Sequence, residues 1–140
     1  MTGKSGILFI ILLITVIFSC EKPGVIVRCD ECLTYEPFEA DLVIKLSPVG
    51  FEQVEVVIYE GNLEDKVIYS SFSTSYTEEN VAVLLNKKYT VTARYIRNGK
   101  TFIAVDSAVP RVKYDKVSCD EPCWFIYDNR IKIALRRSAD

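Results

Sequence analysis

The chain of 140 residues contains no histidine. This absence excludes Ser/His and Cys/His nucleophile pairs, and it excludes zinc sites built on imidazole. Glycine is scarce as well, because the chain has six glycines and none of them are clustered, so it carries no glycine-rich loop for binding phosphate. Carboxylates are numerous but scattered, and no pair has a spacing that marks a catalytic acid and base. The sequence therefore predicts a protein that is not an enzyme.

Positive charge is also limited. The chain has 17 Lys and Arg residues against 19 Asp and Glu. Residues 1–19 hold one of these charges, on Lys4, so the charge of the remainder is 16 − 19 = −3. Binding to nucleic acid requires a basic patch, and the chain offers no basic cluster beyond Arg136 and Arg137. We therefore expect no nucleic-acid partner.

No apolar run is long enough to span a bilayer, which needs about 20 residues. The longest run, residues 7–18, follows the basic Lys4 and precedes the small residue Ser19 and then Cys20. A basic start, a short apolar stretch and a small residue at the end form the pattern of an export signal. We expect cleavage before Cys20; a plain secretory signal cut elsewhere and an uncleaved anchor are the alternatives.

The stretch Ile14-Thr15-Val16-Ile17-Phe18-Ser19-Cys20 resembles the lipobox of bacterial lipoproteins, in the relaxed form found in the Bacteroidota. The resemblance implies that residues 1–19 are a lipoprotein signal peptide and that Cys20 is acylated on its sulfur and amine. Residues 20–24 would form a short tether to the membrane. The resemblance also implies a lipid-anchored protein of the cell envelope, on the outer membrane, with the leaflet left open.

Residues 25–140 have the pattern of a single β-rich domain. No segment shows helical spacing, whereas apolar and polar residues alternate with the period of half-buried strands. A further short apolar run, residues 25–27, is a candidate edge strand, and the polar residues 73–80 are expected to form a loop. Strands are predicted at residues 39–46, 53–60, 67–72, 81–85, 89–97, 100–107, 112–117, 124–127 and 131–135.

The strongest signal is a hairpin near the middle of the domain. Asn98 and Gly99 separate two strand-like runs, and both residues tolerate the positive φ of a type I′ turn. About seven to nine short strands with frequent turns predict an antiparallel β-sandwich. The segment Tyr89-Thr90-Val91-Thr92-Ala93 resembles the Tyr-x-Val-x-Ala strand of immunoglobulin-like and transthyretin-like bacterial surface modules. That resemblance implies one of these two sandwich architectures.

Besides Cys20, the chain has four cysteines in two tight pairs, Cys29 with Cys32 and Cys119 with Cys123. Exported proteins form disulfides, so two bonds between the start and the end of the domain are the first interpretation. Four cysteines allow three pairings, and the sequence does not decide among them. Bonds between the two pairs would each close a loop of about 90 residues.

Two alternatives use the same cysteines. Spacings of C-x2-C and C-x3-C suit a four-thiolate zinc site. A redox-active pair is the other alternative. Cationic neighbours favour thiolates, whereas these cysteines have acidic neighbours. This disfavours both the zinc site and the redox-active pair. The acidic residues are Asp30, Glu31, Asp120 and Glu121.

Trp124 and Tyr127, close behind Cys123, are the candidate ligand-binding residues. Exposed aromatic rings could stack on sugars, although aromatic residues beside a disulfide more commonly pack in the core. As a whole the chain resembles small exported lipoproteins of the Bacteroidota that have a β-sandwich and no assigned activity. We expect a non-enzymatic structural or binding module of the envelope, with an envelope protein or a glycan as partner. A glycan-binding accessory lipoprotein and a metal or redox protein are the alternatives.

Overall fold

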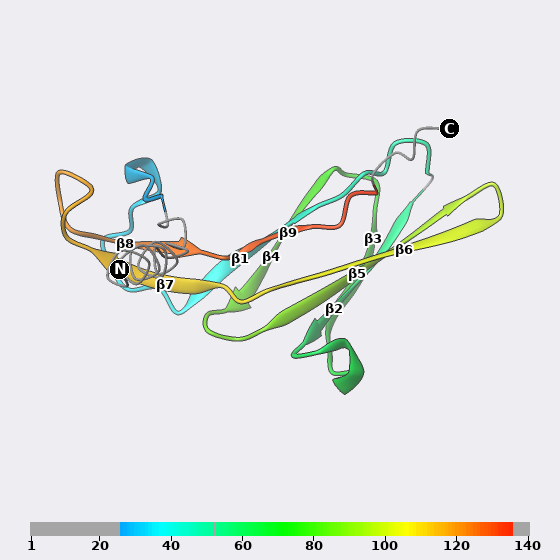
Figure 1. The fold of residues 1–140 in the computed structure, drawn as a ribbon, viewed down its shortest axis with the longest axis horizontal. Helices are drawn as coiled ribbons and strands as arrows, with labels where there is room; N and C mark the ends of the chain where they lie inside the picture. Colours follow the sequence, from blue (N-terminus) through cyan, green and yellow to red (C-terminus); the bar gives the residue numbers. More distant parts are fainter. Residues whose placement is uncertain (1–25, 52, 136–140) are drawn as a thin grey trace, which may run out of the picture.

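The computed structural model describes residues 26–51 and 53–135 (Figure 1). The expected signal peptide 1–19, Cys20 and the tether 20–24 lie outside the described residues. Among the described residues, no helix is long and apolar enough to cross a membrane.

The domain is all-β, as predicted. Its helical content within the described ranges is two 3₁₀ turns, η2 (Cys29–Glu31) and η3 (Leu63–Asp65). The strands are β1 (Glu39–Lys45), β2 (Val54–Glu60), β3 (Ile68–Thr74), β4 (Glu78–Leu84), β5 (Tyr89–Arg97), β6 (Lys100–Ala108), β7 (Arg111–Asp115), β8 (Cys123–Tyr127) and β9 (Arg130–Lys132).

Two sheets form a sandwich. One has the strand order β3-β2-β5-β6 and the other has the order β4-β1-β9. Alternate residues of each strand point inward, because successive side chains of a strand point to opposite faces. Together these residues form one buried cluster, contributed by Leu42, Ile44, Val83 and Ile131 from the smaller sheet and by Val54, Val56, Ile58, Tyr89, Val91, Ala93 and Tyr95 from the larger one.

The predicted hairpin is confirmed. β5 has the predicted bounds, and it pairs with β6 in antiparallel register from Tyr89↔Ala108 to Arg97↔Lys100. Asn98 and Gly99 have φ values of 51° and 73°, and two positive φ values in a two-residue loop are the mark of a type I′ turn.

Two expectations from the sequence are wrong. Residues 73–80 are not a loop, because β3 extends to Thr74 and β4 already begins at Glu78. These polar residues are held in strands by pairing: β4 continues along β1 to Lys45↔Glu78, where the side chains form an ion pair of 3.4 Å. Ile26 and Val27 do not form an edge strand; they lead into η2 instead.

The strand order differs from that of a constant-type immunoglobulin domain counted from its first strand. Immunoglobulin-like constant domains place the first and second strands in the same sheet. Here β1 and β2 lie in opposite sheets, and β1 pairs with β9 in parallel.

A two-stranded ribbon extends from one end of the sandwich. β7 and β8 pair in antiparallel register from Arg111↔Tyr127 to Asp115↔Cys123. β6 leads into β7 through the buried Pro110, whose carbonyl oxygen accepts a hydrogen bond of 2.7 Å from the amide of Asn86. β8 returns into β9 and the smaller sheet, so both ends of the ribbon are fixed to the sandwich (Figure 1).

Candidate functional site

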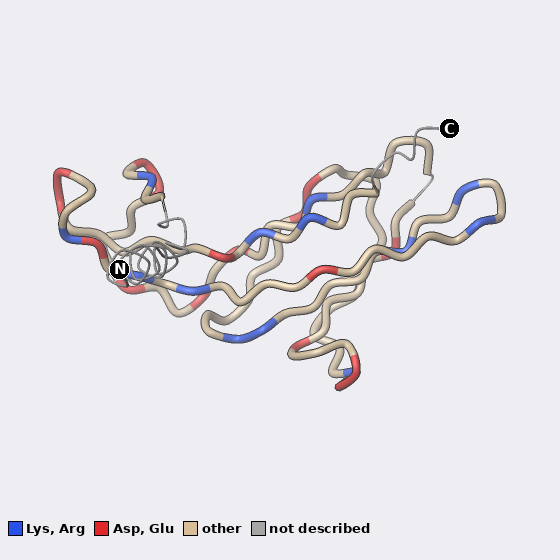
Figure 2. The backbone as a smooth tube through the Cα atoms, in the orientation of Figure 1, with Lys and Arg blue, Asp and Glu red and all other residues tan. Residues whose placement is uncertain are grey.

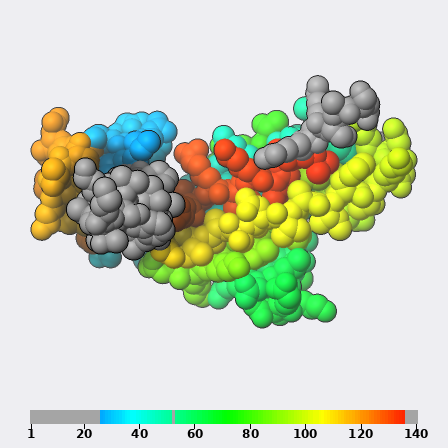
Figure 3. Space-filling model, in the orientation of Figure 1, coloured from blue at the N-terminus to red at the C-terminus, as the bar shows by residue number. Residues whose placement is uncertain are grey.

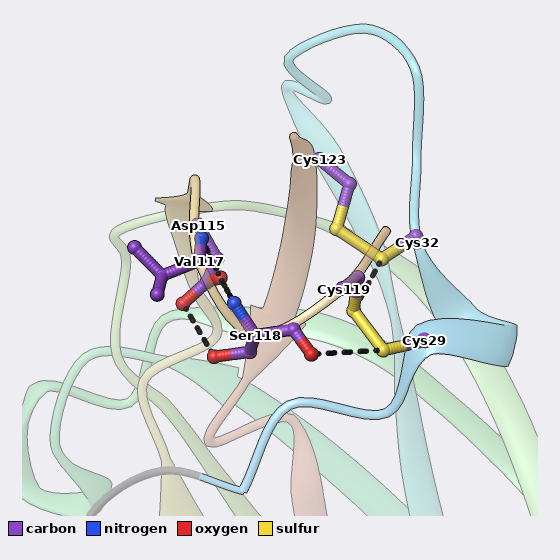
Figure 4. The surroundings of a disulfide bond; sticks show 7 residues. All are labelled: Cys29, Cys32, Asp115, Val117, Ser118, Cys119 and Cys123. Carbon is purple, nitrogen blue, oxygen red and sulfur yellow. Dashed lines mark hydrogen bonds between the residues drawn. A yellow bond between two sulfur atoms is a disulfide. The ribbon is translucent and has the colours of Figure 1, made fainter. Parts of the chain in front are cut away.

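The four cysteines meet at the free end of the β7–β8 ribbon. Two disulfides join the chain there, Cys29–Cys119 and Cys32–Cys123, with Cα–Cα distances of 5.7 Å and 5.4 Å (Figure 4). The predicted disulfides are confirmed, and the structure supplies the pairing that the sequence left open. We call this region, residues 26–33 and 111–127, the cystine end.

Two segments far apart in the sequence form the cystine end, and they lie side by side in Figure 3, coloured blue and orange. η2 places Cys29 and Cys32 on one short turn, next to the loop between β7 and β8. Leu33 then pairs with Trp124 through two backbone hydrogen bonds of 2.8 Å and 2.9 Å. This bridge adds a one-residue third strand beside β8, next to the Cys32–Cys123 disulfide.

The sulfur atoms of the two bonds are close to one another. The Sγ atoms of Cys32 and Cys119, which belong to different disulfides, are 3.6 Å apart. The Sγ atoms of Cys32, Cys119 and Cys123 all lie within 4.8 Å of one another. This spacing would allow the zinc or redox alternatives if the bonds were reduced. As disulfides, however, these sulfurs are not the thiolates that bind zinc.

The acidic residues next to the cysteines are exposed. Arg28 forms ion pairs with Asp30 at 3.1 Å and with Glu31 at 3.0 Å. Surface pairs of this kind contribute little to stability, about 0–1 kcal/mol. They do lower the local density of negative charge around η2.

Asp115 fixes the loop that carries Cys119. Its carboxylate accepts hydrogen bonds from the backbone amides of Ser118 at 2.6 Å and Val117 at 3.0 Å, and from the hydroxyl group of Ser118 (Figure 4). These bonds, chiefly the one from the Ser118 amide, lower the pKa of Asp115 below its usual 3.8. The loop is therefore ordered by the ionised carboxylate.

This arrangement predicts a pH dependence. A carboxyl group with a lowered pKa in the folded state stabilises the fold above its unfolded pKa, and this contribution is lost as the pH falls through the folded value. Asp115→Asn should lower the Tm at pH 7, and the difference from the wild type should shrink as the pH falls below 3.8. Thermal unfolding followed by circular dichroism measures it. Asp120→Asn, an exposed carboxylate in the same loop, is the control; an equal effect from both would refute the role of Asp115.

The two predicted ligand-binding aromatic residues do not form one platform. Trp124 and Tyr127 are three positions apart on β8, so their side chains point to opposite faces of the ribbon. The Tyr127 ring lies beside the Phe125 ring, and their centroids are 6.1 Å apart. It also lines a groove of ≈ 630 Å³, together with Asn80 and Asn129. Trp124 lies on the other face.

Trp124 has a different aromatic partner, Tyr114 on β7. The two residues are directly opposite in the ribbon, and their ring centroids are 4.9 Å apart. Sequence reasoning did not identify this pair, because periodicity places Val112 with Tyr114 on one face of β7 and Trp124 with Ile126 on one face of β8 without joining the two faces. What it could not supply was the β7–β8 register.

Comparison of the chain with protein-family models, with curated proteins and with solved structures found no match. Its function is therefore argued from the sequence and from the geometry of the cystine end.

Proposed function

We propose that the protein is a lipid-anchored component of the bacterial cell envelope. In this proposal Cys20 carries the lipid, and the sandwich is a non-enzymatic structural or binding module. The observation that carries it is the lipobox-like stretch 14–20, placed just ahead of a cystine-bonded segment. Disulfides form and persist in compartments outside the cytosol, where an exported lipoprotein would be located.

The anchor and the cystine end are close along the chain. Nine residues lead from Cys20 to Cys29. Fully extended, such a segment reaches about 30 Å, at roughly 3.3–3.6 Å per residue. The cystine end is therefore the end of the domain nearest the membrane, and the disulfides fix this end to the anchored segment. The β5–β6 hairpin lies at the opposite end (Figure 1) and would project outward.

The lipid is expected to hold the protein on the membrane. Each buried methylene contributes about 0.8 kcal/mol, and two or more acyl chains give stable anchoring. Cys20→Ser should therefore move the protein from the membrane fraction to the soluble fraction. Ser19→Ala, which keeps a small residue before Cys20, should leave it on the membrane.

Cell fractionation and intact mass measure both variants. Globomycin, which inhibits the lipoprotein signal peptidase, should add the mass of residues 1–19 to the wild-type product. A Cys20→Ser protein that stays with the membrane, or a product whose mass is unchanged by globomycin, would contradict the proposal.

A further inference from the structure

The β7–β8 ribbon has one face without charged residues. Because opposite residues in paired strands share a face, Tyr114, Trp124 and Leu33 form one row across it. Val112 and Ile126 form the next row. We call these five residues the ribbon face.

The ribbon face is partly exposed, and its residues Val112, Trp124 and Ile126 are half-buried. Tyr114 is 41% exposed and Leu33 is 38% exposed. The opposite face differs, because Cys123 and Phe125 are only 5% and 4% exposed and are covered by the protein. Cys123 and Phe125 therefore pack against the domain, whereas the ribbon face, which is apolar and aromatic, stays partly exposed among the described residues.

The composition of this face suits a membrane interface. Trp and Tyr combine an apolar ring with a polar group and are enriched at the level of the lipid headgroups. The Nζ atom of Lys116 lies 5.7 Å from the centre of the Tyr114 ring. A lysine beside such a face can keep its ammonium group among the headgroups while its methylenes contact apolar surface.

The chain enters the described structure beside this face. Ile26 is 88% exposed and lines the same groove as Leu33 and Ile126. Five residues lie between it and Cys20, so the two residues can be about 20 Å apart when the segment is extended. A lipid on Cys20 would therefore place the bilayer surface within reach of the ribbon face.

We propose that the ribbon face rests on the phospholipid headgroup layer next to the Cys20 lipid, with Trp124 and Tyr114 at the interface. This inference rests on the proposed function. Figure 2 shows both basic and acidic residues at the cystine end. Its sequence contains Arg28 and Lys113 as well as Asp30 and Glu121. Since neither sign dominates, the contact depends on apolar burial and not on anionic lipid, and it should occur on zwitterionic vesicles and persist in high salt.

Trp124 reports on this contact directly, because it is the one tryptophan of the chain. The acylated protein is reconstituted into phosphatidylcholine vesicles containing brominated lipid, which quenches tryptophan at short range. We expect the emission of Trp124 to shift to shorter wavelength and to be quenched severalfold more than that of the Cys20→Ser protein mixed with the same vesicles.

A second variant moves the reporter to the opposite end. Trp124→Phe combined with Phe102→Trp places the indole near the start of β6, at the β5–β6 hairpin. Phe102 is 42% exposed, so the new side chain has access to the surroundings. Its emission should not be quenched by the brominated lipid.

Flotation of the vesicles distinguishes the Cys20 lipid anchor from the contact of the ribbon face with the headgroups. A protein that floats with the vesicles while Trp124 stays unquenched would overturn the ribbon-face contact and leave the anchor in place. A protein that does not float would overturn both. Emission that responds to added polysaccharide and not to brominated lipid would assign the ribbon face to a glycan and would also overturn the membrane contact.

Discussion

Replacing all four cysteines of the cystine end by serine is expected to lower the free energy of unfolding by roughly 6 kcal/mol. The disulfides join residues 90 and 91 positions apart, so each closes almost the whole domain into a loop. Closing a first loop of this length restricts the unfolded chain by about 4.5 kcal/mol in the chain-entropy account. A domain of this size has a total stability of about 5–15 kcal/mol, so this loss removes much of it.

The contributions of the two bonds should not be additive. Once Cys29–Cys119 is closed, Cys32 and Cys123 are already held near each other, and the second bond closes only a short additional loop. Removing one bond, by Cys32→Ser with Cys123→Ser, should therefore cost only roughly 2 kcal/mol. The decrease in the free energy of unfolding for all four substitutions should then be more than twice the decrease for one pair.

Urea unfolding of residues 21–140, produced in an oxidising compartment, measures these losses. The Cys29/Cys119 pair, the Cys32/Cys123 pair and the fourfold variant form a cycle with the wild type. Additive losses, or a fourfold variant as stable as either pair variant, would contradict the view that the two bonds close one common loop.

Tyr95→Ala is expected to lower the free energy of unfolding by about 4 kcal/mol, as for other large aromatic residues removed from a core. Tyr95 is fully buried on β5. Its hydroxyl group donates a hydrogen bond of 2.8 Å to the carbonyl oxygen of Ile133 and accepts one of 3.3 Å from the amide of Ser47. Ser47 and Ile133 follow β1 and β9, so this side chain links the larger sheet to the smaller one.

Tyr95→Phe separates the ring from the hydroxyl group. It keeps the packing but leaves a buried amide and a carbonyl group without their partner, at a cost of about 1–3 kcal/mol. Tyr69→Phe is the matched control, because the Tyr69 hydroxyl group also bonds a carbonyl oxygen, that of Ala82, but its side chain is 41% exposed. A loss of about 0.5 kcal/mol or less is expected there.

The same hydroxyl group gives a pH signature. Burial raises the pKa of Tyr95 above its usual 10.0, and the bond from the Ser47 amide opposes this only in part. A group whose pKa is raised on folding favours its protonated form in the fold, so stability is lost as the pH rises above the unfolded value. The advantage of the wild type over Tyr95→Phe should therefore narrow above pH 10.0. Equal losses for Tyr95→Phe and Tyr69→Phe at neutral pH would show that the link between the sheets is not important.

Local patterns in the sequence predicted the strands and their inward faces. Tyr89, Val91 and Tyr95 alternate with polar residues on β5, and all three are buried. Asn98-Gly99 fixed the hairpin because its turn type depends only on these two residues and their φ values. Such features are determined by short segments, so they can be derived without knowledge of the rest of the fold.

The remaining features depend on contacts between distant segments. Alternation shows which residues face inward but not which strands are neighbours, so it could not place β1 and β2 in opposite sheets or pair β1 with β9 in parallel. The disulfide pairing also depends on a contact between distant segments, because it is set by where η2 meets the β7–β8 loop. Trp124 and Tyr127 are close in sequence, but the pleat of β8 places their side chains on opposite faces.

One mature chain should carry both a lipid on Cys20 and two disulfides at the adjacent end of the domain. Intact mass spectrometry of the protein extracted from its native envelope, before and after reduction, tests both parts. We expect residues 20–140 with acyl chains on Cys20, and a gain of about 4 Da on reduction, one hydrogen for each of the four bonded sulfurs. A chain that begins at another residue or carries no lipid, or a mass unchanged by reduction, would contradict it.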